Sequence, residues 1–170
     1  MVSMSLLRKL VVAGLVLLAG CRLEDHTPAG SRLDEAQIRE VLFEFYRGLA
    51  TADWGTVRNF FAPAGEVSYQ VMGEGDSLIG PVVVSADSAL LTWARQASGF
   101  DEGDREARIV RADLRQADGV AAVWVTLQLN LPFQPVEGRG GNSEEIQHVV
   151  LHRTAQGWRI VLLSLPWTVR

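Results

Sequence analysis

The spacing of apolar residues changes along the chain, from a helical period near its beginning to strict alternation near its end. The helical stretch predicts one long helix with a broad apolar stripe, formed by Ile38, Val41, Leu42, Phe45 and Leu49. The alternating stretches predict four strands, over Ala107–Gln116, Val120–Leu131, Glu145–Arg153 and Trp158–Leu165. Because helices gather at one end of the chain and a strand meander at the other, we expect an α+β fold in which a curved antiparallel sheet wraps around the N-terminal helices.

Short polar residues mark where the helices are expected to begin. Asp34, with Gln37 three residues later, has the spacing of a capping box and predicts the start of the long helix. Asp53 predicts the start of a second, short helix, and Ser85 or Asp87 predicts that of a third. These signals place all three helices before the four long strands.

Glycine-containing segments predict the turns between strands. Asp118-Gly119 accepts positive φ and predicts a tight hairpin. An alternating run from Glu66 ends at Gly73–Asp76, which predicts a further strand and the first half of another hairpin. The turn Gln134–Ser143 is longer and richer in glycine, so we expect a mobile hairpin tip, with a lid over a pocket as the alternative.

The first residues have the pattern of an export signal. Basic Arg8 and Lys9 precede an apolar run, Leu10–Leu18, which is shorter than the ~20 residues that a membrane-spanning helix needs. The following tetrapeptide, Leu18-Ala19-Gly20-Cys21, resembles a bacterial lipobox, and this resemblance implies cleavage before Cys21 and lipidation of its thiol. A plain signal peptide is the alternative, because small residues also precede its cleavage site.

The chemistry of Cys21 favours lipidation. It is the only cysteine of the 170 residues, so it has no disulfide partner in its own chain. Acyl chains add ~0.8 kcal/mol per buried methylene group, so a diacylated cysteine holds a domain on a lipid bilayer without a spanning helix. Arg22 follows, where aspartate would retain a Gram-negative lipoprotein at the inner membrane. If the cell is Gram-negative, this pattern implies the outer membrane facing the periplasm. We expect a signal peptide over residues 1–20, a lipidated tether over 21–31 and one domain over 32–170.

Composition narrows the range of partners. Removal of residues 1–20 leaves 150 residues, the size of one domain, and takes the formal net charge from −4 to −6. Nucleic acid is therefore not an expected partner, because phosphate binding needs a concentrated basic surface. His148 and His152 lie four residues apart on a predicted strand, ~13 Å along its axis, too far to share a metal ion. We expect neither a metal nor a cofactor.

Two stretches, one in the first two predicted helices and one in the last predicted hairpin, carry a family resemblance. The first is Phe45–Trp54 (FYRGLATADW) with Phe60–Pro63 (FFAP), and the second is His152–Val161 (HRTAQGWRIV). They resemble nuclear transport factor 2-like domains, a group that includes SnoaL-like polyketide cyclases and ketosteroid isomerases. The resemblance covers about residues 32–170 and implies a cystatin-like cone, whose sheet closes over the helices and leaves a pocket at the wide end.

The residues of ketosteroid isomerase chemistry are replaced in this chain. The resemblance puts Phe45 where the family's tyrosine would be, Tyr69 at its basic carboxylate and Val149 at its acidic donor. The polar residues one position away are Tyr46, Ser68 and His148. A slipped alignment restores polar groups but not two carboxylates, so we expect no catalytic residue of that kind.

The facing of the predicted strand Val120–Leu131 is open to two interpretations. By alternation alone, its aliphatic face packs on the helices and its polar face meets water. The family resemblance implies the reverse, with the polar face in the pocket and the aliphatic face buried in a homodimer. We favour the family's arrangement, in which the pocket is lined by Phe45, Tyr69, Trp124, Thr126 and Gln128.

Two functions of different classes follow. The first is a cell-envelope lipoprotein with a non-catalytic domain that binds a small apolar ligand or another envelope protein. The alternative is a membrane-tethered SnoaL-like isomerase, lyase or hydrolase that acts on a small apolar substrate through Tyr46, Tyr69 or His148. A buried acid or histidine with a strongly shifted pKa, open to the pocket, would favour the enzyme.

Replacement of Cys21 by serine tests the anchor. The Cys21→Ser variant should leave the membrane fraction without unfolding, because it loses its acyl chains but no contact of the domain. Membrane fractionation, with circular dichroism on the released protein, measures both. Unchanged membrane association of the variant would contradict the lipoprotein assignment.

Overall fold

The computed structural model describes residues 29–72, 78–98, 106–130 and 143–168. Within these ranges three helices and six strands occur in the order predicted from the sequence. The helices are α2 (Ala29–Ala50), α3 (Trp54–Phe60) and α4 (Ala86–Ala97). The strands are β1 (Phe61–Met72), β2 (Leu78–Ser85), β3 (Glu106–Ala117), β4 (Val120–Asn130), β5 (Ser143–Thr154) and β6 (Gly157–Thr168). The predicted α+β class is confirmed.

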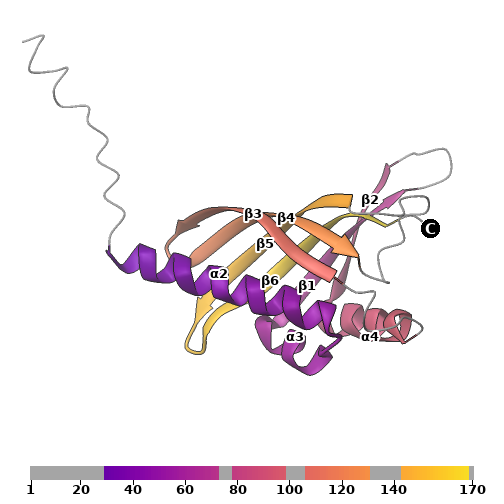
Figure 1. The fold of residues 1–170 in the computed structure, drawn as a ribbon, viewed down its shortest axis with the longest axis horizontal. Coiled ribbons are helices and arrows are strands. Elements are labelled where there is room, and N and C mark those ends of the chain that lie inside the picture. The colour runs from indigo at the N-terminus through magenta and orange to yellow at the C-terminus, as the bar shows by residue number, and fades with distance from the viewer. Residues whose placement is uncertain (1–28, 73–77, 99–105, 131–142, 169–170) are drawn as a thin grey trace, which may run out of the picture.

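One curved sheet contains all six of these strands, in the order β2-β1-β6-β5-β4-β3. Neighbouring strands are antiparallel except β1 and β6, which are parallel. Figure 1 shows α2 lying across the sheet, with α3 and α4 near its C-terminal end. The sheet therefore has one face covered by helices, as the sequence predicted.

The core lies between α2 and the concave face of the sheet. The predicted apolar stripe of α2 is buried except Val41, which packs against the core from a partly buried position. Phe45 is fully buried, and its ring meets that of Phe61 edge to face with centroids 5.6 Å apart. The sheet contributes Val123, Val125, Leu127, Val149, Leu151, Ile160 and Leu163. Burial of each such side chain contributes roughly 1.5–3 kcal/mol, so this layer supplies the main stabilisation.

Asp34 does not cap the long helix. Helix α2 begins at Ala29, before the predicted capping box, so the predicted start of this helix is wrong. The Asp34 side chain is instead only 10% exposed and faces the sheet. Its carboxylate accepts hydrogen bonds from Trp158 Nε1 at 3.4 Å, Gln116 Nε2 at 3.2 Å and Arg153 Nη1 at 3.1 Å. One acidic side chain thus joins α2 to β3, β5 and β6.

The other two helix starts were predicted correctly. Asp53 caps α3, since its carboxylate accepts a hydrogen bond from the Thr56 backbone N–H. Hydrogen bonds from the Thr56 side chain and backbone lower the pKa of Asp53. Ser85, rather than Asp87, caps α4 by accepting from the Ser88 backbone N–H. Helix α3 ends directly in β1, so this strand starts at Phe61, earlier than the alternation from Glu66 indicated.

The tight turn between β3 and β4 forms as predicted. Asp118 and Gly119 both have positive φ, 49° and 77°, as the two central residues of a type I′ hairpin require. Gly157 opens β6 with φ of 98°. The predicted turns at Gly73–Asp76 and Gln134–Ser143 fall almost wholly outside the described residues.

Removal of the Asp34 carboxylate should destabilise the fold. In Asp34→Ala, the buried indole N–H of Trp158 loses its acceptor, which costs about 1–3 kcal/mol of unfolding free energy. Asp113→Ala is the matched control, because Asp113 is exposed and pairs with exposed Arg111, so a change within about 0.5 kcal/mol is expected. Urea unfolding measures both, and equal values for the two variants would contradict the role of Asp34.

Candidate functional site

The polar face of β4 points away from the helices. Trp124 is 40% exposed, and Thr126 and Gln128 share its face by strand alternation. The buried residues of this strand are Ala121, Val123, Val125 and Leu127. The prediction that Trp124, Thr126 and Gln128 line a pocket beside Phe45 is therefore wrong, as is burial of the aliphatic face in a homodimer. The aliphatic face packs on α2 because this buries apolar area without stranding polar groups.

Phe45 and Tyr69, the other two predicted lining residues, do lie on the helix side of the sheet. Phe45 belongs to the core and is closed off from solvent. Tyr69 is partly buried in β1 and packs against the core. Burial raises the pKa of Tyr69 to about 12, and a hydrogen bond with Trp93 of α4 opposes the shift. Tyr69 therefore carries a neutral phenol at any physiological pH.

A chain of three hydrogen-bonded polar side chains crosses this interior. The Tyr46 hydroxyl donates to Gln147 Oε1 at 2.9 Å, and Gln147 Nε2 donates to Glu145 Oε1 at 2.8 Å. Tyr46 is 1% exposed and Gln147 is 3% exposed, whereas Glu145 is only partly buried. The chain thus leads from the core outward to a carboxylate. We define Tyr46, Gln147 and Glu145 as the polar relay.

Sheet register places the polar relay and Tyr69 in one row across the sheet, with β6 between them. Gln147 pairs with Val125 of β4, and Glu145 pairs with Leu127, so both point to the helix side with these aliphatic residues. Tyr69 pairs with Leu165 of β6, which lies next to β5. Helix α2 supplies Tyr46 from above this row. The relay and Tyr69 therefore occupy one end of the sheet, where β5 begins and β1 nears its end.

The electrostatics of the polar relay keep Tyr46 protonated. Burial raises the pKa of Tyr46 well above its ordinary value of 10.0, and the negative charge of Glu145 raises it further. A neutral Tyr46 is a hydrogen-bond donor and not a base at neutral pH. The arrangement can therefore orient Gln147 and Glu145 and hold the hydrogen-bonding groups of a ligand.

The sequence analysis missed Gln147 and Glu145. Strand alternation could have located both residues. It puts Glu145 and Gln147 on the same face as Val149 and Leu151, and these last two are aliphatic. Extending the aliphatic face back along the strand would have placed both polar residues inside.

The remaining polar candidates lie apart from the polar relay. His148 faces the opposite side of the sheet, where its ring stacks on Trp124 with centroids 4.9 Å apart. Asp34, a second carboxylate on the helix side, precedes Tyr46 by twelve residues of α2, ~18 Å along the helix. The structure thus brings Tyr46 and Tyr69 to one end of the sheet but does not add His148 or a second carboxylate there from the described residues.

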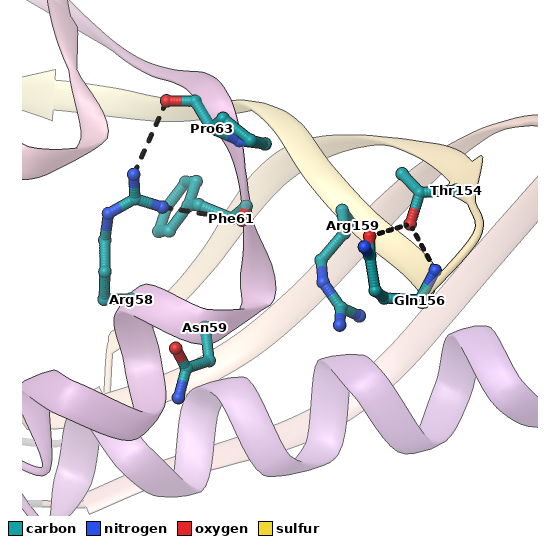
Figure 2. A pocket seen from close by; sticks show the side chains of 7 residues that line it. All are labelled: Arg58, Asn59, Phe61, Pro63, Thr154, Gln156 and Arg159. Atoms are coloured by element: carbon teal, nitrogen blue, oxygen red, sulfur yellow. Dashed lines mark hydrogen bonds between the residues drawn. The ribbon is translucent and has the colours of Figure 1, made fainter.

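A separate cleft of about 720 Å³ opens at the other end of β5. It lies between α3, the start of β1 and the hairpin that joins β5 to β6 (Figure 2). Its lining is Arg58, Asn59, Phe61, Pro63, Thr154, Gln156 and Arg159. None of these residues was predicted as a site residue from the sequence.

Two further properties concern metals and membranes. Within the described ranges, no three His, Cys, Asp or Glu side chains lie close enough together to bind a metal ion. Likewise, none of the helices described by the structure is both long and apolar enough to span a membrane.

The two tyrosines of the chain, Tyr46 and Tyr69, should ionise late. Both have a raised pKa in the folded state, so little tyrosinate absorbance should appear at pH 10, and Tyr69 should reach half ionisation at about 12. Between pH 10 and 12 the unfolded chain releases protons that the folded chain retains, so the unfolding free energy should fall there and not below. Near-ultraviolet titration measures this, with Tyr69→Phe as the control that leaves Tyr46 alone. Ionisation of both tyrosines at pH 10 would contradict the burial of the relay.

Comparison with known proteins identifies the fold and no closer relationship. No protein-family model matches the chain, and no curated protein matches it. A nuclear transport factor 2-like protein with a cystatin-like fold from Novosphingobium aromaticivorans is 18% identical, with a TM-score of 0.60 over 85% of this chain and 91% of that one. A cystatin-like protein of unknown function from Nostoc punctiforme is 14% identical, with a TM-score of 0.58 over 79% of this chain and 90% of that one.

A third similar structure carries a functional description. It is a candidate ketosteroid isomerase from Shewanella frigidimarina, 15% identical, with a TM-score of 0.52 over 74% of this chain and 90% of that one. At these identities the likeness concerns architecture alone. The curved six-stranded sheet around its helices therefore has the nuclear transport factor 2-like, cystatin-like fold.

Proposed function

We propose that this protein is a cell-envelope lipoprotein, held on a bilayer by acylated Cys21, whose domain binds a small, largely apolar ligand without catalysis. The binding site is the end of the sheet where Tyr69 and the polar relay lie. The ligand places its apolar part against Tyr69 and directs a hydrogen-bond donor at Glu145. Lipidation places this site in the envelope, on the outer membrane facing the periplasm in a Gram-negative cell.

The polar relay is the observation that carries the proposal. Tyr46 and Gln147 are buried among aliphatic side chains, where apolar residues would pack equally well. Burial of a polar group costs free energy unless the group is hydrogen-bonded, as these two are. Their hydrogen bonds run outward and end on a partly buried carboxylate. Glu145, which accepts the bond from Gln147, is the outermost member of the relay, and its carboxylate offers acceptor oxygens to a ligand donor. Such a few placed polar groups in apolar surroundings are typical of small-molecule sites.

Binding is favoured over proton transfer by the state of the tyrosines. Tyr46 and Tyr69 both have a raised pKa, so neither serves as a base near neutral pH. Of the other described carboxylates, the adjacent Glu144 lies on the outer face of β5, and Asp34 lies twelve residues from Tyr46 on α2. The pair of acid and base needed for isomerisation is thus incomplete in the part of the chain that the structure covers.

One observation favours the enzyme as a second candidate. Glu145 is a carboxylate joined through Gln147 to a neutral tyrosine, and a base beside a donor is the minimum for abstracting a proton next to a carbonyl. A membrane-tethered isomerase, lyase or hydrolase of the SnoaL-like kind would use these groups. The candidate isomerase among the similar structures is consistent with this second function.

A homodimer through the outer face of the sheet remains a proposal for the partner. This face exposes Val110, Trp124 and Ile146, with Ile146 59% exposed. On the same face the Nε2 atom of His148 is buried without a hydrogen-bond partner in the described residues. Exposed apolar side chains in such number mark a contact surface. Sedimentation of the detergent-solubilised protein as a monomer at all concentrations would contradict the homodimer.

Ligand binding is tested with a neutral apolar probe that carries one N–H donor, N-phenylnaphthylamine. The full chain in detergent should bind it saturably. Gln147→Leu and Glu145→Gln should each weaken binding by roughly tenfold, about 1.4 kcal/mol, because the first removes the donor that orients the Glu145 carboxylate and the second removes the charge of this acceptor. The matched control is Gln128→Leu on the outer face, which should leave the dissociation constant unchanged. Probe fluorescence gives the constants. Equal affinities in all four proteins would reject the site.

Proton exchange separates the two candidate functions. In deuterated water, an enzyme of the second kind should speed deuterium incorporation next to the carbonyl of cyclohexanone, and Glu145→Gln should abolish the effect. A binding protein should leave the buffer rate unchanged. Proton magnetic resonance of the ketone measures the rate, and Glu145-dependent acceleration would replace the binding proposal by the enzyme.

A further inference from the structure

We infer that the cleft between α3 and the β5–β6 hairpin is a second binding site, which takes small molecules that join a single carboxylate to an apolar group. It shares no residue with the polar relay and does not depend on the proposed function. Its volume of about 720 Å³ lies within the range of small-molecule sites, roughly 300–1,000 Å³. Five of its seven lining side chains are polar.

Arg159 supplies the charge that recognises the carboxylate. Its guanidinium lies within the cleft, as Figure 2 shows, and Nη1 donates to the Trp158 carbonyl at 2.9 Å. Among the residues that the structure describes, no carboxylate lies within 4.0 Å of it, unlike Arg39, Arg58, Arg111 and Arg153. A partly buried guanidinium has five N–H donors in a planar fork, which matches a carboxylate. Arg159 thus has a charge without a counter-charge and donors to spare.

Arg58, on the opposite wall, is already occupied. Its Nε and Nη2 donate to the Asp87 carboxylate, with the Nη2 bond at 3.4 Å. Its Nη1 donates to the Ala62 carbonyl at 3.4 Å and Nη2 to the Pro63 carbonyl at 3.4 Å. Arg58 therefore fixes the wall of the cleft and carries a neutralised charge. The cleft therefore offers one net positive charge, that of Arg159, which a monocarboxylate balances better than a phosphate dianion does.

The hairpin wall is held in place before any ligand binds. The Thr154 hydroxyl accepts from the Gln156 backbone N–H at 3.1 Å and donates to the Gly157 carbonyl at 2.8 Å. Gly157 takes φ of 98°, which turns the chain back toward Arg159. Because hydrogen bonds already hold this turn in one conformation, ligand binding costs little conformational entropy at this wall of the cleft.

Neutral and apolar groups complete the site. Asn59 and Gln156 add amide donors on two sides of the Arg159 guanidinium (Figure 2). Phe61 and Pro63 give the cleft its apolar part, next to the Arg58 wall. A ligand with one charged end and one apolar end meets both kinds of surface. We therefore assign aromatic or aliphatic monocarboxylates as the ligand class.

The experiment uses three probes on the full chain in detergent: benzoate, its neutral isostere benzamide, and inorganic phosphate. Backbone amide resonances of Thr154–Gly157 should shift saturably with benzoate, and roughly tenfold more weakly with benzamide or phosphate, because a charge-assisted bidentate contact or the apolar contact is lost. Arg159→Gln should weaken benzoate binding by a similar factor. Arg159→Lys, which keeps the charge but loses the fork, should give an intermediate constant.

The control variant loses one arginine charge at a position outside the cleft. Arg95→Gln removes the same charge from exposed α4, outside the cleft, and should leave benzoate binding unchanged. The melting temperature of each variant reports whether it is folded. Absence of a saturable shift, an unchanged constant in Arg159→Gln and Arg159→Lys, or phosphate affinity equal to that of benzoate would each overturn the inference.

Discussion

A single buried carboxylate, that of Asp34, fixes the long helix against the sheet. Its three hydrogen-bond donors come from three different strands and lie 82, 119 and 124 residues away in sequence. Apolar contacts alone leave a helix free to slide or roll, because dispersion and the hydrophobic effect have no direction. A charged acceptor that must meet an indole N–H removes this freedom. With its first turns fixed, α2 presents Tyr46 to Gln147 rather than to a neighbouring residue of β5.

Strand β5 connects the two candidate sites. Glu145 and Gln147 lie near its beginning, and Thr154 lies at its end, nine residues or ~30 Å from Glu145. The first site is an interior arrangement in which hydrogen bonds support an otherwise apolar surface. The second is an open cleft organised around one unpaired cation. These sites would recognise different chemistry, a neutral apolar ligand at one end of the strand and a carboxylate at the other.

The sequence predicted those parts of the fold that depend on neighbours along the chain. The apolar stripe of α2, the Asp53 cap and the Asp118-Gly119 turn are local patterns, and all three were confirmed. The role of Asp34 was misassigned because its capping-box spacing is also local, whereas Trp158 is visible only after folding. The facing of β4 was wrong because a family pattern was preferred over simple alternation. Lipidation of Cys21 stays a prediction, and the cleft could not be foreseen, since it joins α3 to a hairpin about a hundred residues later.

The parallel pairing of β1 with β6 has a consequence for how the domain is assembled. Strand β6, the last described segment, does not add to an edge but fills the middle of the sheet, between β1 and β5. Its pairs with β1 join residues such as Tyr69 and Leu165, about a hundred positions apart. Until β6 pairs with both neighbours, the β1–β2 hairpin and the β3–β4–β5 meander are two separate parts of the sheet. The complete sheet therefore cannot form until β6 has been synthesised, and its formation should be slow, as is usual for a topology dominated by contacts between distant parts of the chain.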